Sequence, residues 1–373
     1  MNIKRFIVFI VSFAIIILAG VKINSVEKTE LISTDGREFE KAKVVEVVSK
    51  SATSDDRAGM QQVKVKIKTG EHKGEIFDAT SSLSYLYGAD CKVNMNVIVI
   101  ISESDNYTSV SVYNYDRGNQ LYMIIGIFIL TLVIIGGLKG FKSALGLIFT
   151  FGCVIFLFLP LIYRGISPIY ASIVLVIITT IVVMYLIDGI TVKSCCAMAG
   201  TILGVTIAAI FAWIFGKMTY ISGNNVDDIE SLIYISEMTD IKIGELMFAG
   251  ILISALGAVM DVAMSIASTI NEIHDKNSEL SAHELFKSGI NVGKDMMGTM
   301  SNTLILAFAG GSINTFVYIY SYNYQYYQTL NMYSVGIEII KGISATMGVI
   351  LTVPLVSVIT AYALTEKNRV IKE

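Results

Sequence analysis

The pattern of apolar and polar residues divides the chain into one polar stretch and a series of long apolar runs. From residue 121 onward each run holds about 18 to 26 residues with few charges, enough for a helix to cross about 30 Å of hydrocarbon. The pattern predicts a polytopic α-helical membrane protein with about eight spans. These are residues 1–23, 121–138, 143–163, 168–187, 194–216, 246–270, 299–320 and 339–364.

The first apolar run, residues 6–19, follows Lys4 and Arg5 and so has the pattern of a signal peptide. No clear small-x-small cleavage site follows it, because the run Leu18-Ala19-Gly20 makes a poor one. We therefore favour an uncleaved membrane anchor over residues 1–23. Cleavage is the alternative.

Between residues 24 and 120 the chain is polar, and its apolar residues alternate with polar ones. Alternation of this kind, interrupted by turn residues such as Gly70 and Gly74, is typical of short strands. Five strands in about 75 residues favour a small closed all-β barrel of OB-like type, since closure leaves no exposed sheet edge. The predicted strands are residues 43–48, 63–68, 75–79, 97–101 and 110–113.

Composition supports a membrane protein and narrows the role of the barrel. Charged residues make up 16% of the chain, against roughly 25% in soluble domains. The net charge is −3, and the strands carry no cluster of stacking aromatics among basic residues, which single-stranded nucleic acids require. We expect no nucleic-acid partner and favour a spacer or assembly role for the barrel. Only Cys91 of the four cysteines lies in the polar stretch, so no disulfide is expected there.

Lysine and arginine are unevenly distributed among the predicted loops, which predicts the orientation. If Lys4 and Arg5 are cytoplasmic, both termini and a loop at residues 271–298 are cytoplasmic, and residues 24–120 are extracytoplasmic. The short outer loops then hold only Arg164, Lys217 and Lys242, with Lys341 at a helix edge. The inner segments hold Lys139, Lys142, Lys193, Lys276, Lys287, Lys294, Lys367, Arg369 and Lys372.

No catalytic motif stands out. None of the three histidines lies in a span, and neither a His-Glu-x-x-His run nor a phosphate-binding loop is present. His274, Asp275, His283 and Glu284 could bind a metal, but a solvated acidic loop is the favoured interpretation. We therefore expect neither enzymatic activity nor a cofactor. Ser281 and Glu284 predict a capping box that opens a short interfacial helix.

Asp261 is the most informative residue of the spans, because a carboxylate at this depth costs about 2.5–3.5 kcal/mol on an insertion scale. Small and polar residues continue from it at helical spacing along one face. A tight helix–helix seam would explain the stripe, and so would a polar cavity. The stripe comprises Ser254, Gly257, Asp261, Ser265, Ser268 and Glu272.

Three further features lie at a similar depth. Gly310 and Gly311 are paired glycines that can unwind a helix, Asn314 lies one turn beyond Gly310, and Pro354 interrupts helical hydrogen bonding. Such features line the cavities of transporters, although they also occur in packed bundles. The outer loop 318–333 is rich in tyrosine, which favours the membrane interface.

The segments DVAMSIASTINEI at residues 261–273 and GKDMMGTMSNTLILAFAGG at residues 293–311 resemble the signature region of the YibE/F-like family of bacterial multi-pass membrane proteins. The resemblance implies an anchor, a small outer β domain and a multi-span body in the bacterial plasma membrane. It implies no mechanism.

Two functions of different classes are therefore open. The first is a permease or export component for a small solute or ion. The second is a non-transporting membrane protein whose outer β domain docks a partner or a cell-envelope protein. A homo-oligomer is compatible with both. The predicted cavity-lining residues of the first are Asp261, Ser265, Asn302, Gly310, Gly311, Asn314 and Pro354.

Overall fold

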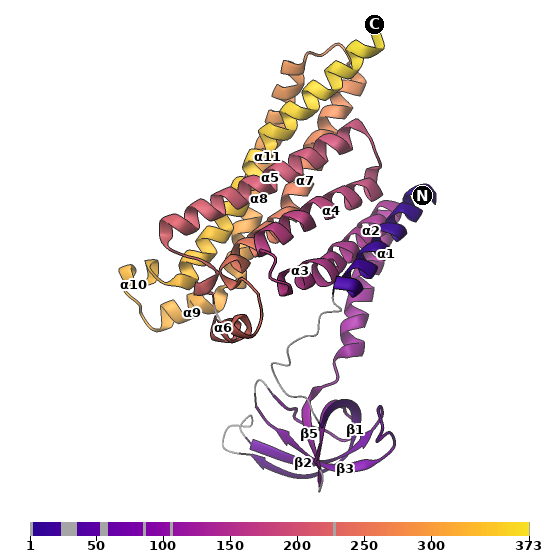
Figure 1. Cartoon of the computed structure of the whole chain (residues 1–373), viewed down its shortest axis with the longest axis vertical. Coiled ribbons are helices and arrows are strands. Elements are labelled where there is room, and N and C mark those ends of the chain that lie inside the picture. Colours follow the sequence, from indigo (N-terminus) through magenta and orange to yellow (C-terminus); the bar gives the residue numbers. More distant parts are fainter. Residues whose placement is uncertain are drawn as a thin grey trace. The chain divides into compact units, whose positions relative to one another are not determined.

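The computed structural model describes residues 3–23, 36–52, 59–84, 87–104, 107–226 and 229–372. The chain divides into two compact units, which we describe separately (Figure 1). Residues 30–131 form the barrel unit, and residues 1–29 together with 132–373 form the helical unit.

The barrel unit is a closed five-stranded barrel, as the alternating pattern predicted. Its strand order is β1-β2-β3-β5-β4, and every neighbouring pair is antiparallel except the parallel pair β3 and β5. The strands are β1 Arg37–Ala52, β2 Gly59–Ile67, β3 Ile76–Ser82, β4 Asn96–Ser104 and β5 Tyr107–Tyr115.

Alternating residues on these strands form the barrel core. Val44 of β1 pairs with Val65 of β2, and both side chains are fully buried, as are Val63, Val97 and Val99. The intervening residues point outward and include an ion pair of 3.1 Å between Lys64 and Glu46. The period of two thus places the apolar residues inside and the charged residues in water.

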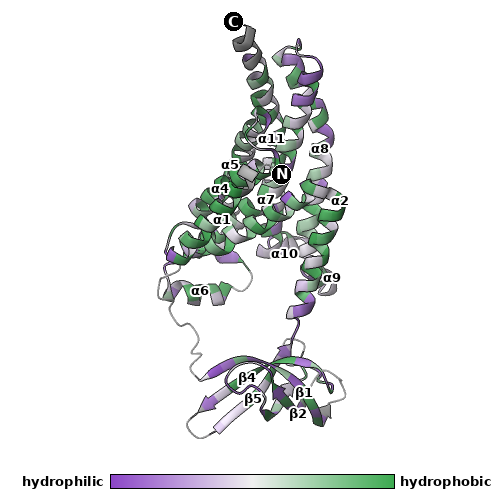
Figure 2. Cartoon of the chain, turned by 90° about the vertical axis from the view of Figure 1, so that its right-hand side faces the viewer, coloured by the Kyte–Doolittle hydropathy of each residue, from purple (hydrophilic) through white to green (hydrophobic). Residues whose placement is uncertain are grey.

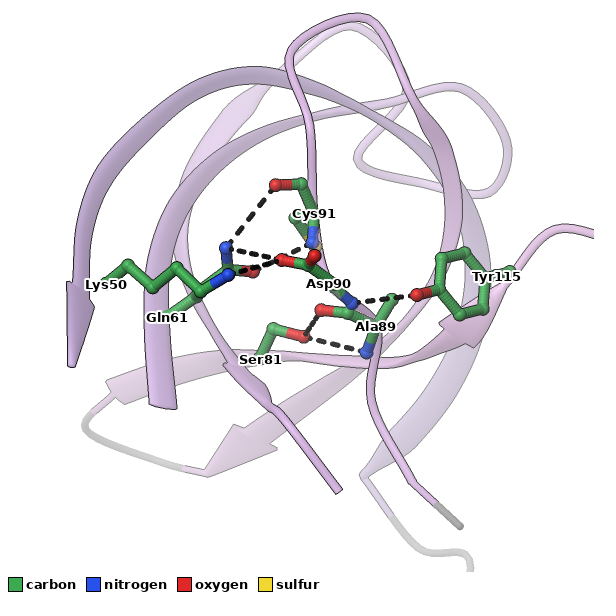
Figure 3. A network of polar contacts seen from close by, with 7 residues as sticks. All are labelled: Lys50, Gln61, Ser81, Ala89, Asp90, Cys91 and Tyr115. Carbon is green, nitrogen blue, oxygen red and sulfur yellow. Dashed lines mark hydrogen bonds and ion pairs between the residues drawn. The ribbon is translucent and has the colours of Figure 1, made fainter. Parts of the chain in front are cut away.

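A segment between β3 and β4 closes one end of the barrel, and Figure 3 shows how polar contacts hold it. Gln61, only 2% exposed, accepts a hydrogen bond from the Cys91 backbone N–H at 2.8 Å and donates to Asp90 at 3.2 Å. Ser81 bonds both backbone groups of Ala89, at 2.7 and 3.0 Å. The buried amide and hydroxyl therefore have partners, as buried polar groups require.

The helical unit contains apolar helices of very different lengths. Figure 2 shows apolar residues along most of the long helices. The helices are α1 Ile3–Ile23, α2 Gly118–Cys153, the π-helix η1 Val154–Phe158, α3 Leu159–Tyr163, α4 Pro168–Asp188, α5 Val192–Thr219, α6 Ile229–Met238, α7 Leu246–Lys276, α8 Ala282–Gly311, α9 Ile313–Ser321, α10 Tyr326–Leu330 and α11 Tyr333–Lys372, with 3₁₀ turns η2 Gly223–Asn225 and η3 Ile243–Glu245. The first part of α2, to Thr131, belongs to the barrel unit.

The predicted count of eight spans is not confirmed. Within the described residues, five helices are long and apolar enough to cross a membrane, or six if the bent pair α8 and α9 is one span. The apolar stretch Ile7–Lys22 is shorter. Two predicted spans lie in one helical run, Gly118–Tyr163, which is non-helical only at Gly137 (φ 55°, ψ −135°).

Close packing through small residues holds the core of the helical unit together. A Cβ at Gly204 of α5 would lie 1.9 Å from Thr352 Oγ1 of α11, and one at Gly200 would lie 2.1 Å from Val356 Cγ2. A Cβ at Gly293 of α8 would lie 2.2 Å from Val353 Cγ1 of α11. Glycines spaced four residues apart let helix backbones approach closely in lipid.

The connections of the helical unit gather at two opposite ends. At one end Ser167 donates a hydrogen bond to Glu245, and Gly165 lies against Asp240. Figures 1 and 2 both place α6, α9 and α10 at this end. At the other end, the α7–α8 turn and the last turns of α11 line a common pocket, with Leu280, Ser281, Tyr362 and Thr365 among its residues. Consecutive long helices therefore connect at alternate ends, as membrane spans do.

The structure corrects two predicted boundaries. The predicted loop 271–298 is mostly helical: α7 continues to Lys276 and α8 begins at Ala282, with the predicted capping box between Ser281 and Glu284. The short interfacial helix is instead the first part of α8, and Gly289 packs against Ser357. Helix α6 was not predicted, because its ten residues are too few and too polar to indicate a span.

Candidate functional site

The helix break at the paired glycines is the first element of the candidate site. Helix α8 ends at Gly311, Ser312 leaves helical geometry (φ −102°, ψ 19°), and α9 begins at Ile313. The two helices meet at an angle of 61°. Glycine is less favourable than alanine inside a helix by about 1 kcal/mol per residue. Gly310 and Gly311 together therefore disfavour a continuous helix here.

A partly open cavity of about 410 Å³ lies beside this break, between α8–α9 and the first turns of α11. Most of its wall is apolar, and the polar groups gather at the end near Ser312. Its volume lies within the range of roughly 300–1,000 Å³ that is usual for small-molecule sites. The wall includes Ile305, Phe308, Phe316, Ile339, Gly342 and Ile343.

A second, smaller cavity of about 50 Å³ adjoins the polar end and shares four lining residues with the first. These are Ser312, Thr315, Ser334 and Glu338. Lys341 lines the smaller cavity, and its ammonium lies 2.8 Å from Glu338 Oε1. The polar end therefore carries one carboxylate, one ammonium and three hydroxyls, and its formal charge is balanced.

Gly342 forms part of the cavity wall without contributing a side chain. A Cβ at Gly342 would stand 3.9 Å from Phe308 Cδ2 and 4.0 Å from Ile305 Cγ1, which is ordinary van der Waals contact. A larger side chain at this position would therefore extend into the cavity rather than into another helix.

The stripe on α7 lies on the exposed face of an otherwise buried helix. Ser254, Gly257, Asp261 and Ser265 are exposed, whereas the opposite face, with Val259, Val262 and Ile266, is completely buried. No heavy atom would lie within 4 Å of a Cβ at Gly257. Within the described part of the chain the stripe is therefore not a sealed seam between two helices.

The predicted cavity-lining residues fall in three places. Asp261 and Ser265 lie on the exposed face of α7, and Pro354 is partly buried in α11, which continues through it as one helix. Around the break, Gly310, Gly311 and Asn314 are exposed, and Asn302 is exposed farther back on α8. None of the seven lines the cavity beside the break. Their grouping into one site stays a prediction.

The prediction missed the residues that line the two cavities, above all Glu338, which lines both, and Lys341, which lines the smaller one. The predicted last span began at residue 339, so Glu338 fell outside it and Lys341 stood at its edge. A usable signal was present, since opposite charges three residues apart at the start of an apolar helix are placed to pair.

Among the residues that the structure describes, no three side chains of the metal-binding types come together. His274 is buried and lies 4.0 Å from an oxygen of the exposed Asp275. Glu284 accepts hydrogen bonds from Ser281 in the capping box. Ser281 and Glu284 thus cap the first turn of α8.

The chain has a small β barrel and a unit of long apolar helices, and these helices also expose large apolar side chains such as Ile210. It is therefore a multi-pass membrane protein.

Comparison with family models then gives the particular family. A model described as YibE/F-like protein matches residues 124–366, and one described as YibE/F family N-terminal domain matches residues 38–115. The chain therefore belongs to the YibE/F-like family, as the resemblance in residues 261–273 and 293–311 indicated. No curated protein and no solved structure matches it.

Proposed function

We propose that the chain is a permease or export component for a small solute. The observation that carries the proposal is the break between α8 and α9 beside a cavity of about 410 Å³. Broken helices expose backbone groups to a ligand and give two helix segments freedom to rotate about the break, which are properties of transporter binding sites.

The exposed stripe on α7 gives independent support. A carboxylate such as Asp261 is expensive in hydrocarbon, and no described atom would lie within 4 Å of a Cβ at Gly257, one helical turn away. A water-filled path along α7 would satisfy Asp261 at the lowest cost. We propose that the cavity at the break and the stripe at Asp261 serve the same transport function.

We further propose that the protein lies in the bacterial plasma membrane with both termini in the cytoplasm. Lys142 donates a 2.8 Å hydrogen bond to the Ile187 carbonyl, and Lys193 pairs with Asp188 at 3.2 Å, so these lysines share one end of the helical unit. The positive-inside rule makes this end cytoplasmic. Labelling of Ser281→Cys by an impermeant reagent in intact cells would contradict this orientation.

The transport proposal can be tested without knowing the solute. In a strain that lacks the gene, solutes in the cells and in the medium are compared by mass spectrometry before and after the protein is restored. We expect at least one small solute to change its cell-to-medium ratio, and the wild type to restore it. Gly310→Ala combined with Gly311→Ala should fail to restore it, because alanine favours a continuous helix by roughly 1 kcal/mol per position.

The matched control is Gly298→Leu, which lies on α8 where no atom stands within 4 Å of a Cβ. This variant should restore the ratio as the wild type does. Asp261→Asn should insert normally and fail to restore it. The transport proposal is overturned if no solute changes its cell-to-medium ratio when the gene is lost. It is also overturned if Asp261→Asn restores the ratio fully.

A docking function for the barrel is the second candidate, and one observation favours it. Phe39 of β1 and Tyr113 of β5 form an edge-to-face pair of 5.2 Å on the outside of the barrel, with 55% and 42% of these residues exposed. The parallel β3–β5 closure supports the OB-like assignment, and such barrels often bind on their outer face. If docking is the function, Phe39→Ser with Tyr113→Ser should abolish the cellular phenotype while solute ratios stay unchanged.

A further inference from the structure

The cavity beside the helix break has two chemically different ends, and this difference defines what it can hold. One end is built from Ile305, Phe308 and Phe316 with Ile339 and Ile343 opposite. The other presents Glu338, which pairs with Lys341 in the adjoining smaller cavity. A ligand that fills the cavity must therefore be amphipathic, with an apolar body and a polar head.

The balance of charge at the polar end restricts the head further. Glu338 and Lys341 are both only partly exposed, with side-chain exposures of 24% and 32%. A singly charged ligand that displaced one member of the pair would leave the other without a partner in a poorly solvated site, which is strongly unfavourable. A zwitterionic head can replace the one ion pair by two, so that no charge is left over.

The position of each charge sets the orientation of such a head. Glu338 lines both cavities, whereas Lys341 lines only the smaller one. A ligand ammonium would thus meet Glu338 at the end of the large cavity, and a ligand carboxylate would point into the smaller cavity toward Lys341. The hydroxyls of Ser312, Thr315 and Ser334 line both cavities and can hydrogen-bond either group.

We propose that this cavity binds zwitterionic solutes with a compact apolar body, of the kind represented by large apolar α-amino acids. The proposal names the substrate class of the site described above and so rests on the proposed transport function. The two parts of the ligand are recognised separately. The apolar wall limits the size of the apolar body, and the ion pair favours a head group with no net charge.

Three probes with the same phenyl body separate these two contributions. L-phenylalanine is zwitterionic, phenethylamine is a cation and 3-phenylpropanoate is an anion. Binding of each radiolabelled probe is measured by equilibrium dialysis against the purified full-length protein in lipid nanodiscs. We expect the wild type to bind phenylalanine at least tenfold more tightly than either singly charged probe.

Two single substitutions should move this preference in opposite directions. Lys341→Gln leaves Glu338 alone and should make phenethylamine the tightest probe. Glu338→Gln leaves Lys341 alone and should make 3-phenylpropanoate the tightest. A general loss of folding cannot produce this reversal, because it would weaken all three probes together.

A cavity-filling variant tests the apolar end. Gly342→Leu should weaken all three probes more than tenfold, whereas Gly298→Leu on the open surface of α8 should bind as the wild type does. If Gly342→Leu proves unstable, the smaller Gly342→Ala, for which van der Waals contact is available, should weaken binding in the same direction.

The outcomes separate the substrate class from the transport function. The proposed substrate class is wrong if the folded wild type binds none of the three probes. It is also wrong if the wild type, Lys341→Gln and Glu338→Gln all bind the probes in the same order of affinity. In that case a solute ratio that still depends on Gly310 and Gly311 would leave the transport proposal standing. Phenylalanine binding together with unchanged solute ratios would support the site and overturn transport.

Discussion

Both units bury large apolar side chains, but they differ in what their outer surfaces expose. In the barrel, Val63, Val65 and Val99 are completely buried, and charged residues alternate with them on the outside. In the helical unit glycines such as Gly204 make the closest contacts between helices, while Ile210 is 51% exposed. Burial of apolar surface from water stabilises the first arrangement. Close packing stabilises the second, because lipid tails already solvate isoleucine.

Buried thiols allow both units to be followed in the same sample. Cys91 is 3% exposed in the barrel, and Cys153 is completely buried in the helical unit. In urea, iodoacetamide modifies each thiol when its unit unfolds, and mass spectrometry of the two peptides gives a separate midpoint for each unit. The Cys91 midpoint thus reports unfolding of the barrel, and the Cys153 midpoint reports unfolding of the helical unit.

The largest expected effect is the loss of the folded helical unit in Gly204→Leu. A Cβ at this position would lie 1.9 Å from Thr352 Oγ1 and 2.8 Å from Val259 Cγ1, so helices α5, α7 and α11 would have to separate. Overpacking costs about 1–3 kcal/mol where the surroundings can adjust, and more where they cannot. Cys153 should be modified without urea, while the midpoint of Cys91 stays unchanged.

Gly298→Leu is the matched control for this substitution, because open space surrounds Gly298. Its Cys153 midpoint should equal that of the wild type. Equal behaviour of the two leucine variants would mean that close glycine packing does not hold the helical unit together.

The second prediction applies one substitution to both units. Ile101→Ala in the barrel, where Ile101 is 1% exposed, should lower the free energy of unfolding by about 2–5 kcal/mol through lost burial and the cavity left behind. Ile210→Ala on the outer surface of α5 should change the free energy of unfolding little, because this side chain contacts lipid both in the folded unit and after the helices separate. The measurement is the Cys91 midpoint for the first variant and the Cys153 midpoint for the second. A large fall for Ile210→Ala would show that a further protein surface covers this face.

The barrel was predicted well from the sequence because each of its strands carries its own signal. Residues 63–68 alternate Val, Lys, Val, Lys, Ile and Lys, and the structure places the apolar members inside. A period of two bounded by turn residues identifies strand and face together. The segment that closes the barrel end was not predicted, since Gln61 and Cys91 lie 30 positions apart and nothing local relates them.

The helical unit was predicted less completely, for a physical reason. Length and hydropathy identify apolar helices, but they do not decide whether a break such as Gly137 ends a span or interrupts one. The break at Gly310 and Gly311 was predicted because two adjacent glycines are a local signal. The cavity was not, because its wall combines residues of α8, α9 and α11, and no local signal in the sequence brings these helices to one place.

The third prediction concerns the buried amide of the barrel. Gln61→Leu keeps the volume of the side chain but leaves the Cys91 N–H without its 2.8 Å partner. A buried donor without an acceptor costs about 1–3 kcal/mol, so the Cys91 midpoint should fall and that of Cys153 should not. The control is Gln62→Leu, one residue along β2 on the exposed face. A wild-type midpoint in Gln61→Leu would mean that the segment around Cys91 is held by its other contacts alone.

The smallest expected effect is a pH dependence confined to the barrel. The His72 ring lies between two carboxylates, with Nε2 2.7 Å from Glu103 and Nδ1 3.0 Å from Glu75. These hydrogen bonds raise the pKa of His72 above its ordinary value of 6.5, and the bond to Glu103 contributes most. The protonated ring is therefore favoured in the folded barrel.

The sign of the pH effect follows from this direction. A group with a raised pKa in the folded state contributes its full stabilisation below its ordinary pKa and loses it as pH rises through the raised value. The Cys91 midpoint should accordingly be higher at pH 5.5 than at pH 9, with labelling rates normalised to the unfolded protein at each pH. In His72→Gln the difference should shrink, because glutamine cannot take up the proton. Lys73→Gln removes a neighbouring exposed charge but leaves both carboxylates on His72, so it should keep the wild-type dependence. If the Cys91 midpoint of the wild type instead rises from pH 5.5 to pH 9, protonation of His72 does not stabilise the folded barrel.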